Sequence, residues 1–187
     1  MLFRSRPPKH NKPGGWHGAT VCFAWSVCLI EVKSRASQDL FTEKNGKTVF
    51  SPTEDGQKTR EQILRYVVEL FLRQHRESVF IVLIIGRQAR LTRWDRTGVI
   101  TTAPFDYTEG SHHLFTFVYR LGKSNRAGQG FDPTVLPASQ EQIKDLKAFK
   151  ETVTNKYEQQ FLKEMLEDEG LYPIQQVCVS DIVFRVQ

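Results

Sequence analysis

No acidic residue occurs in the first 30 positions of this 187-residue chain. Basic residues are present there, and Arg4, Arg6, Lys9 and Lys12 lie among prolines and glycines. A segment of this composition cannot form an apolar core, so we expect a flexible basic tail over residues 1–18. The formal net charge of +5 is a weak indication of an anionic partner.

Cysteine is also scarce, and Cys22, Cys28 and Cys178 are the three in the chain. They form no Cys-x-x-Cys pair, which argues against a structural zinc site and a disulfide framework. Each lies among apolar neighbours, so we expect buried reduced thiols and an intracellular protein, cytoplasmic or nuclear. No apolar run approaches the ~20 residues of a membrane helix, and no membrane partner is expected.

The apolar segments that are present alternate between the strand and helix periods. An apolar strand ends at residue 33, a hairpin strand covers 47–50, and Thr59 and Gln62 form a capping box that opens a helix to about Arg76. Residues 78–86 are apolar on both faces, as in a central strand, and 89–95 and 99–102 read as a hairpin. This order predicts one α/β domain over residues 19–187, with a mixed central sheet flanked by helices.

The C-terminal third is predicted to be mainly helical. Residues 111–122 favour a helix, and 123–137 favour a loop. Ser139 and Gln142 form a second capping box, which opens the longest helix to about Glu169, with Gly170 as its end signal. Residues 177–186 close the chain as a strand.

Glu31 and Lys33 end the first strand, and alternation along a strand puts both side chains on one face. Nucleases of the PD-(D/E)xK class place a carboxylate and a lysine in this way. Glu31 would then be a Mg²⁺ ligand and Lys33 would stabilise charge on a phosphate. The simpler interpretation is a surface ion pair at the end of a strand, which contributes little to stability.

Gln62 and Tyr66 lie four residues apart on the predicted helix, and therefore on one of its faces. In many nucleases of this class a Gln-x-x-x-Tyr pair faces the strand with the carboxylate and the lysine. The simpler interpretation is a capping-box glutamine beside a half-buried tyrosine. The first carboxylate of a metal site, which should precede Glu31, is missing, and the sequence gives no reason to assign its role to Asp39 or Asp95.

Arginines surround a tryptophan in the segment 87–96. Arg90, Arg93, Trp94 and Arg96 are candidates for phosphate or nucleic-acid contact, with Trp94 as a stacking surface. Alternation places Arg90, Trp94 and Arg96 on one face and Arg93 on the other. We favour the alternative of an exposed hairpin in which an arginine stacks on Trp94 and pairs with Asp95.

The motifs of a protein kinase do not occur in this sequence. No glycine-rich loop precedes residues 30–33, no catalytic Asp or Asn follows His75-Arg76, and no Asp-Phe-Gly is found. We therefore expect the kinase domain to be absent from this chain.

Several longer segments resemble the N-terminal region of the fungal-type protein kinase family. They are 30–34, 59–66, 71–76, 83–86, 89–98, 105–107 and 130–135, and the resemblance covers roughly residues 15–187. In that family the region precedes a kinase domain and resembles a PD-(D/E)xK nuclease, as in Crinkler-type proteins. The resemblance implies a restriction-endonuclease-like fold. The segment between Trp16 and Ile30 is unlike the usual lead into the strand, which leaves the site without its first carboxylate.

From these residues and this resemblance, we expect a nuclease-like accessory domain of a fungal-type protein kinase. It would be catalytically degenerate and would act by binding nucleic acid or a partner such as a kinase domain, without a cofactor. One alternative is an active Mg²⁺-dependent nuclease that uses Glu31 and Lys33, together with Gln62 and Tyr66. Another is a structural docking domain for a kinase.

Overall fold

The computed structural model describes residues 23–110, 112–167, 174–179 and 182–186. The described chain forms two compact units, residues 23–132 and residues 133–186. The predicted tail over 1–18 lies outside the described residues. Two compact units can belong to one domain or form two, so the single domain predicted over residues 19–187 stays a prediction.

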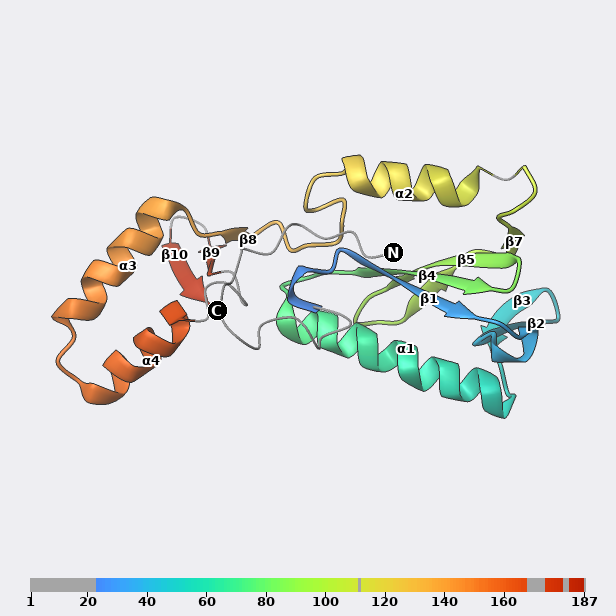
Figure 1. Ribbon diagram of the computed structural model, residues 1–187, viewed down its shortest axis with the longest axis horizontal. Coiled ribbons are helices and arrows are strands. Elements are labelled where there is room, and N and C mark those ends of the chain that lie inside the picture. The colour runs from blue at the N-terminus through green and yellow to red at the C-terminus, as the bar shows by residue number, and fades with distance from the viewer. Residues whose placement is uncertain (1–22, 111, 168–173, 180–181, 187) are drawn as a thin grey trace, which may run out of the picture. The chain divides into compact units, whose positions relative to one another are not determined.

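The first unit is built on a mixed sheet in the order β1-β4-β5-β6 (Figure 1). Its strands are β1 (Cys28–Lys33), β4 (Val79–Ile85), β5 (Gln88–Trp94), β6 (Val99–Thr101) and the short β7 (Phe105–Asp106), which pairs with β5. β1 runs parallel to β4, whereas β5 is antiparallel to β4, β6 and β7. The predicted mixed α/β architecture is confirmed, and a restriction-endonuclease-like fold remains a hypothesis.

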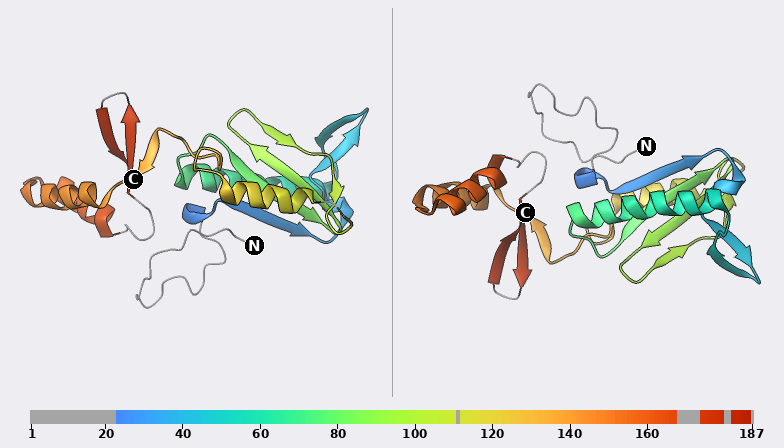
Figure 2. Two further views of the ribbon diagram at one scale, coloured as in Figure 1. Left: turned by 90° about the horizontal axis from the view of Figure 1, so that it is seen from above. Right: turned by 90° about the horizontal axis from the view of Figure 1, so that it is seen from below.

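Helices α1 (Glu54–Arg73) and α2 (His113–Lys123) cover opposite faces of this sheet (Figures 1 and 2). The central strand β4 supplies apolar side chains to both faces. Ile81 belongs to the core under α1, and Val82 belongs to the smaller core under α2. This double burial explains why the strand has no polar face, as the sequence predicted.

Helix α1 begins earlier than predicted. Thr53 is its N-cap, and the Thr53 hydroxyl accepts a hydrogen bond from the Gly56 amide at 3.1 Å. Glu54 and Asp55 occupy the first turn, where negative charge suits the helix dipole. The predicted cap at Thr59 is therefore wrong, since Thr59 is buried in the second turn. The helix ends at Arg73, before the predicted Arg76, because Gln74 is already extended.

Between β1 and α1 lies a small hairpin of β2 (Phe41–Lys44) and β3 (Lys47–Phe50). Its turn is Asn45-Gly46, and both residues have positive φ angles, of 52° and 71°. A two-residue turn of this kind matches the twist of its strands, so the hairpin predicted around 47–50 is confirmed. Two short 3₁₀ helices, Phe23–Trp25 and Ala36–Gln38, flank β1 in the chain.

The second unit contains β8 (Val135–Pro137), α3 (Gln140–Thr152), α4 (Lys156–Glu167), β9 (Gln175–Val179) and β10 (Ile182–Val186). The capping box of Ser139 and Gln142 is confirmed at the start of α3. One helix to Glu169 is wrong, because Val153 turns extended into a local core and the Asn155 side chain accepts from the Tyr157 amide, which starts α4. Gly170 lies outside the described residues.

Two strand predictions for this unit are also corrected. The single strand predicted over 177–186 is replaced by two antiparallel strands, β9 and β10. Strand β8, which pairs with β9, lies within the predicted loop 123–137. By contrast, the helix predicted over 111–122 in the first unit is confirmed as α2. Nowhere in the described ranges does a helix have the length and apolar character of a membrane span.

Candidate functional site

Glu31, Lys33, Gln62 and Tyr66, the four residues predicted to form a nuclease-like site, lie together in the structure. The Lys33 ammonium is 2.8 Å from the Glu31 carboxylate and donates a hydrogen bond of 2.7 Å to the Gln62 side-chain oxygen. The Gln62 amide in turn donates to the Tyr66 hydroxyl at 2.5 Å. The end of β1 and the middle of α1 therefore share one polar network.

The fold places these residues by simple periodicity. Glu31 and Lys33 are two positions apart on β1 and share a face, and their strand is fixed by parallel pairing with β4. Gln62 and Tyr66 are one helical turn apart on α1, whose neighbours Ile63 and Val67 are buried against the sheet. Gln62 lies well inside the helix, so its interpretation as a capping residue is wrong.

The network is largely shielded from water. The side chains of Lys33 and Glu31 are 15% and 14% exposed. The ion pair of the simpler interpretation is therefore present at the end of β1, but its two charges are mostly shielded from water and each lies beside its counter-charge. The Lys33 ammonium pairs with the Glu31 carboxylate and donates a hydrogen bond to Gln62, so its charge is compensated within the protein.

The network offers few of the oxygen ligands that a magnesium ion takes. Mg²⁺ takes an octahedral set of oxygen ligands, usually several waters with one or two carboxylates and substrate phosphates. Within the described ranges, no three His, Cys, Asp or Glu side chains form a group able to hold a metal. Glu31 is the one carboxylate of the network, and Lys33 already neutralises it.

The two aspartates that could replace the missing ligand have other partners. Asp39 pairs with the Arg90 guanidinium at 2.9 Å and accepts from the Phe41 amide, also at 2.9 Å. Asp95 closes the β5–β6 turn by accepting from the side chain and the backbone amide of Thr97. These hydrogen bonds, with the Thr97 hydroxyl first, lower the pKa of Asp95. Each carboxylate therefore has a local structural role.

The predicted contact surface of Arg90, Arg93, Trp94 and Arg96 is not one surface. Arg90 and Trp94 are each 3% exposed, because this face of β5 packs inward toward α1. The Trp94 indole donates to the Thr92 hydroxyl at 2.8 Å and offers no face for base stacking. A ligand-contact role for Arg90 and Trp94 receives no support from this burial.

The other two arginines of that prediction differ from the buried pair. Arg93 is partly exposed and lies 3.3 Å from the Asp95 carboxylate, and Arg96 is exposed in the turn. The Arg93–Asp95 ion pair of the favoured alternative is present. The stacking on Trp94 that it also assumed is wrong, because the ring is in the core. Strand alternation shows which residues share a face, but not which face is inward.

A buried arginine that sequence analysis missed lies after the end of α1. Arg76 donates to the carbonyls of Gln129 at 2.8 Å and Ser26 at 2.9 Å, and its guanidinium lies 3.8 Å from the centre of the Phe131 ring. Burial, followed by the nearby Arg126, lowers the pKa of Arg76 to about 9. Arg76 thus holds three distant segments together. Sequence analysis missed this role because it extended the helix to Arg76. The chain is already extended at Gln74, and alternation along an extended chain puts Gln74 and Arg76 on the same side.

Cys28 is buried and unpaired, as predicted. Burial raises the pKa of its thiol to about 12, so the thiol stays protonated at neutral pH. Cys22 and the side chain of Cys178 lie outside the described part of the structure.

The structure thus defines a mixed α/β protein with a closed polar network at the end of a parallel strand pair. A family model described as "Fungal protein kinase" matches residues 45–177, well over half of the chain. The chain belongs to the fungal protein kinase family. The match includes Gln62 and Tyr66, whereas Glu31 and Lys33 precede it. No curated protein and no solved structure matches the chain.

Proposed function

We propose that this chain is an accessory domain of a fungal-type protein kinase, built like a PD-(D/E)xK nuclease but catalytically degenerate, and that it acts by binding a protein partner. One observation carries the proposal. The Lys33 ammonium is held at 2.8 Å from Glu31 and at 2.7 Å from Gln62, so the two charged groups of the nuclease-like site neutralise each other.

Metal-dependent phosphodiester cleavage needs the opposite arrangement. A carboxylate must be available to a divalent cation, and the lysine must be available to the phosphate. Here, Glu31 would have to exchange Lys33 for a cation, with no second carboxylate beside it among the described residues. The network therefore favours a structural role for Glu31, Lys33, Gln62 and Tyr66 over a catalytic one.

The outer surface of α1 favours a protein partner. Leu64, Val68 and Leu72 are 42%, 52% and 76% exposed and follow one another at four-residue spacing along the helix. A contiguous exposed apolar stripe is typical of a protein interaction site. Because the chain belongs to the fungal protein kinase family, we propose a kinase domain as this partner.

Charge gives less support to nucleic acid as the partner. Several exposed arginines of the first unit already have a carboxylate, with Arg73 paired to Glu69, Arg87 to Glu109 and Arg93 to Asp95. Phosphate contacts require cations that can release counterions, and a paired arginine contributes less to this. Arg96 is the remaining exposed cation of the predicted contact set.

Cleavage of labelled DNA and RNA in Mg²⁺ or Mn²⁺ separates binding from catalysis. We expect the same background for the wild-type protein and for Glu31→Gln, which keeps the shape of the side chain but removes its charge. Cleavage that requires the metal and is lost in Glu31→Gln would contradict the proposal and establish the active Mg²⁺-dependent nuclease.

The partner is tested with a purified kinase domain of the same family, by calorimetry. Val68→Glu places a charge in the centre of the α1 stripe and should weaken binding at least about tenfold. Ile100→Glu is the matched control, because Ile100 is also an exposed apolar residue, 67% against 52% for Val68, but lies on β6. Equal affinities for both variants, or DNA binding that falls steeply with salt, would contradict a protein partner at α1.

A further inference from the structure

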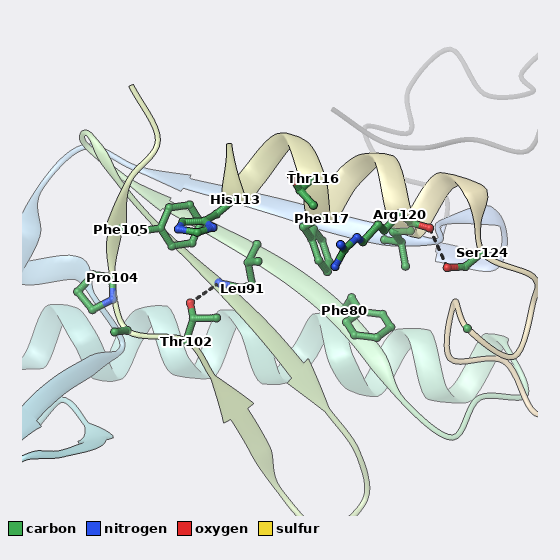
Figure 3. A pocket seen from close by; sticks show the side chains of 13 residues that line it. Phe80, Leu91, Thr102, Pro104, Phe105, His113, Thr116, Phe117, Arg120 and Ser124 are labelled. Atoms are coloured by element: carbon green, nitrogen blue, oxygen red, sulfur yellow. Dashed lines mark hydrogen bonds between the residues drawn. The ribbon is translucent and has the colours of Figure 1, made fainter. Parts of the chain in front are cut away.

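A cavity of about 610 Å³ lies between α2 and the sheet, on the face opposite α1 (Figure 3). Its walls are mainly apolar and include Phe80 and Leu91 from the sheet, Phe105 from β7, and Phe117 from α2. The volume is in the range of pockets that bind small molecules, about 300–1,000 Å³. The site is separate from the network of Glu31, Lys33, Gln62 and Tyr66.

The cavity exists because α2 is held off the sheet by aromatic contacts. His113 meets the Phe105 ring edge-on at a centroid distance of 5.4 Å, and Phe117 meets Phe80 at 5.8 Å. Leu121 is the one buried residue of α2. The helix is therefore supported near both ends, and the space between the supports is left open.

Two polar side chains in the wall have their hydrogen-bonding groups free within the described part of the chain. Neither the Arg120 guanidinium nor the His113 imidazole forms a hydrogen bond or an ion pair with any residue in the described ranges. Two hydroxyls of the wall are already used, since Ser124 donates to the Arg120 carbonyl at 2.7 Å and Thr102 accepts from the Leu91 amide at 3.1 Å. Figure 3 shows the Arg120 guanidinium alongside Phe117 at the cavity.

The charge at this cavity has one sign. No Asp or Glu is among the lining residues, so Arg120 is a cation without a counter-charge beside an apolar surface. A carboxylate complements a guanidinium, because its two oxygens can accept a bidentate pair of charge-assisted hydrogen bonds. The apolar wall requires that the rest of the ligand be apolar too.

We propose that this cavity binds a small amphipathic carboxylate, with an aromatic or branched apolar body between Phe80, Leu91 and Phe117 and a carboxylate on Arg120. The nuclease-like interpretation does not assign such a site, and the proposal does not depend on it. His113, at the other end of the cavity, limits the length of the apolar body.

The test uses 2-naphthoate as the probe and 2-naphthamide as its neutral analogue, with binding to the full chain measured by calorimetry. We expect saturable binding of 2-naphthoate and at least about tenfold weaker binding of the amide. Arg120→Gln should weaken 2-naphthoate about tenfold and leave the amide unchanged. Lys123→Gln is the matched control, because it removes a positive charge from the same helix outside the cavity and should leave both affinities unchanged.

A second variant tests the location. Thr116→Trp places a large ring in the wall of the cavity and should abolish binding of both probes while the thermal unfolding transition is retained. Failure of the wild-type protein to bind 2-naphthoate at millimolar concentration would overturn the proposal. Equal affinity of wild type and Arg120→Gln, or unchanged binding by a folded Thr116→Trp, would overturn it as well.

Discussion

The two faces of the sheet in the first unit are covered to different degrees. On one face, α1 buries Ile63, Val67 and Leu70 in a continuous core with β1, β4 and β5. On the other face, α2 buries Leu121, and most of the apolar side chains around it are half exposed. The α1 face therefore supplies stability and holds the polar network, whereas the α2 face keeps space for a ligand.

The largest expected difference between the faces comes from two isoleucines of one strand. Ile81 is completely buried on the α1 face, and Ile84 is half-buried on the α2 face. We expect Ile81→Ala to lower the free energy of unfolding by about 3 kcal/mol and Ile84→Ala by about 1 kcal/mol. Urea denaturation measures both, and equal losses would show that the α2 face is packed as tightly as the α1 face.

The second comparison uses one cation from each face. Lys33→Met leaves the Glu31 charge largely buried without its partner and should cost about 2 kcal/mol. Arg120→Met, on the α2 face, should change stability by less than about 0.5 kcal/mol. The double variant Glu31→Gln/Lys33→Met should recover part of the loss. If urea denaturation showed no such recovery, the loss of stability in Lys33→Met would not come from the broken ion pair.

Two glycines give a third comparison. A Cβ atom on Gly56, at the start of α1, would lie 2.7 Å from the Asp39 carbonyl oxygen and from the Ser51 Cβ atom, whereas a Cβ atom on Gly122 in α2 would meet nothing within 4 Å. Gly56→Ala should cost about 1.5 kcal/mol, and Gly122→Ala should stabilise the protein by about 0.5 kcal/mol. The midpoint of thermal unfolding should therefore fall for Gly56→Ala and rise for Gly122→Ala. Shifts of the same sign would contradict the tight packing at Gly56.

The last comparison concerns the reactivity of a thiol under α2, which has the smallest expected effect on stability. Because burial raises the pKa of Cys28 to about 12, its thiolate fraction near pH 8 should be roughly a thousandfold below that of a free cysteine. Alkylation by iodoacetamide, followed by mass spectrometry of the Cys28 peptide, should be negligible in the folded protein and complete in urea. Rapid alkylation of the folded protein would mean that α2 lifts from the sheet and exposes it.

The sequence predicted the elements whose signals are local. The strand at Val79–Ile85 has apolar side chains on both faces, and the hairpin turn at Asn45-Gly46 has the residues that positive φ angles favour. The start of α1 could not be chosen in this way, since Thr53 and Thr59 are both plausible caps. In the structure Gly56, in the first turn of α1, packs closely against Ser51 and against Asp39, which lies 17 residues earlier, and this contact with Asp39 could not be foreseen from local spacing.

Periodicity in the sequence predicts which residues form the candidate site, but it does not predict what the site does. Spacing on a strand and on a helix brings Glu31 and Lys33 to one face and Gln62 and Tyr66 to another, so their proximity follows from periodicity and from the resemblance. Periodicity does not show that Lys33 neutralises Glu31. Nor does it show that Trp94 faces the core.

The most direct test of the closed network is a calorimetric titration of the wild-type protein with Mg²⁺ and with Mn²⁺, alongside Glu31→Gln as the matched variant. If Lys33 satisfies the Glu31 carboxylate, both proteins should give the same weak, unsaturable heats. Stoichiometric metal binding by the wild-type protein that is lost in Glu31→Gln would contradict a degenerate site, and would show that Glu31 exchanges Lys33 for a divalent cation.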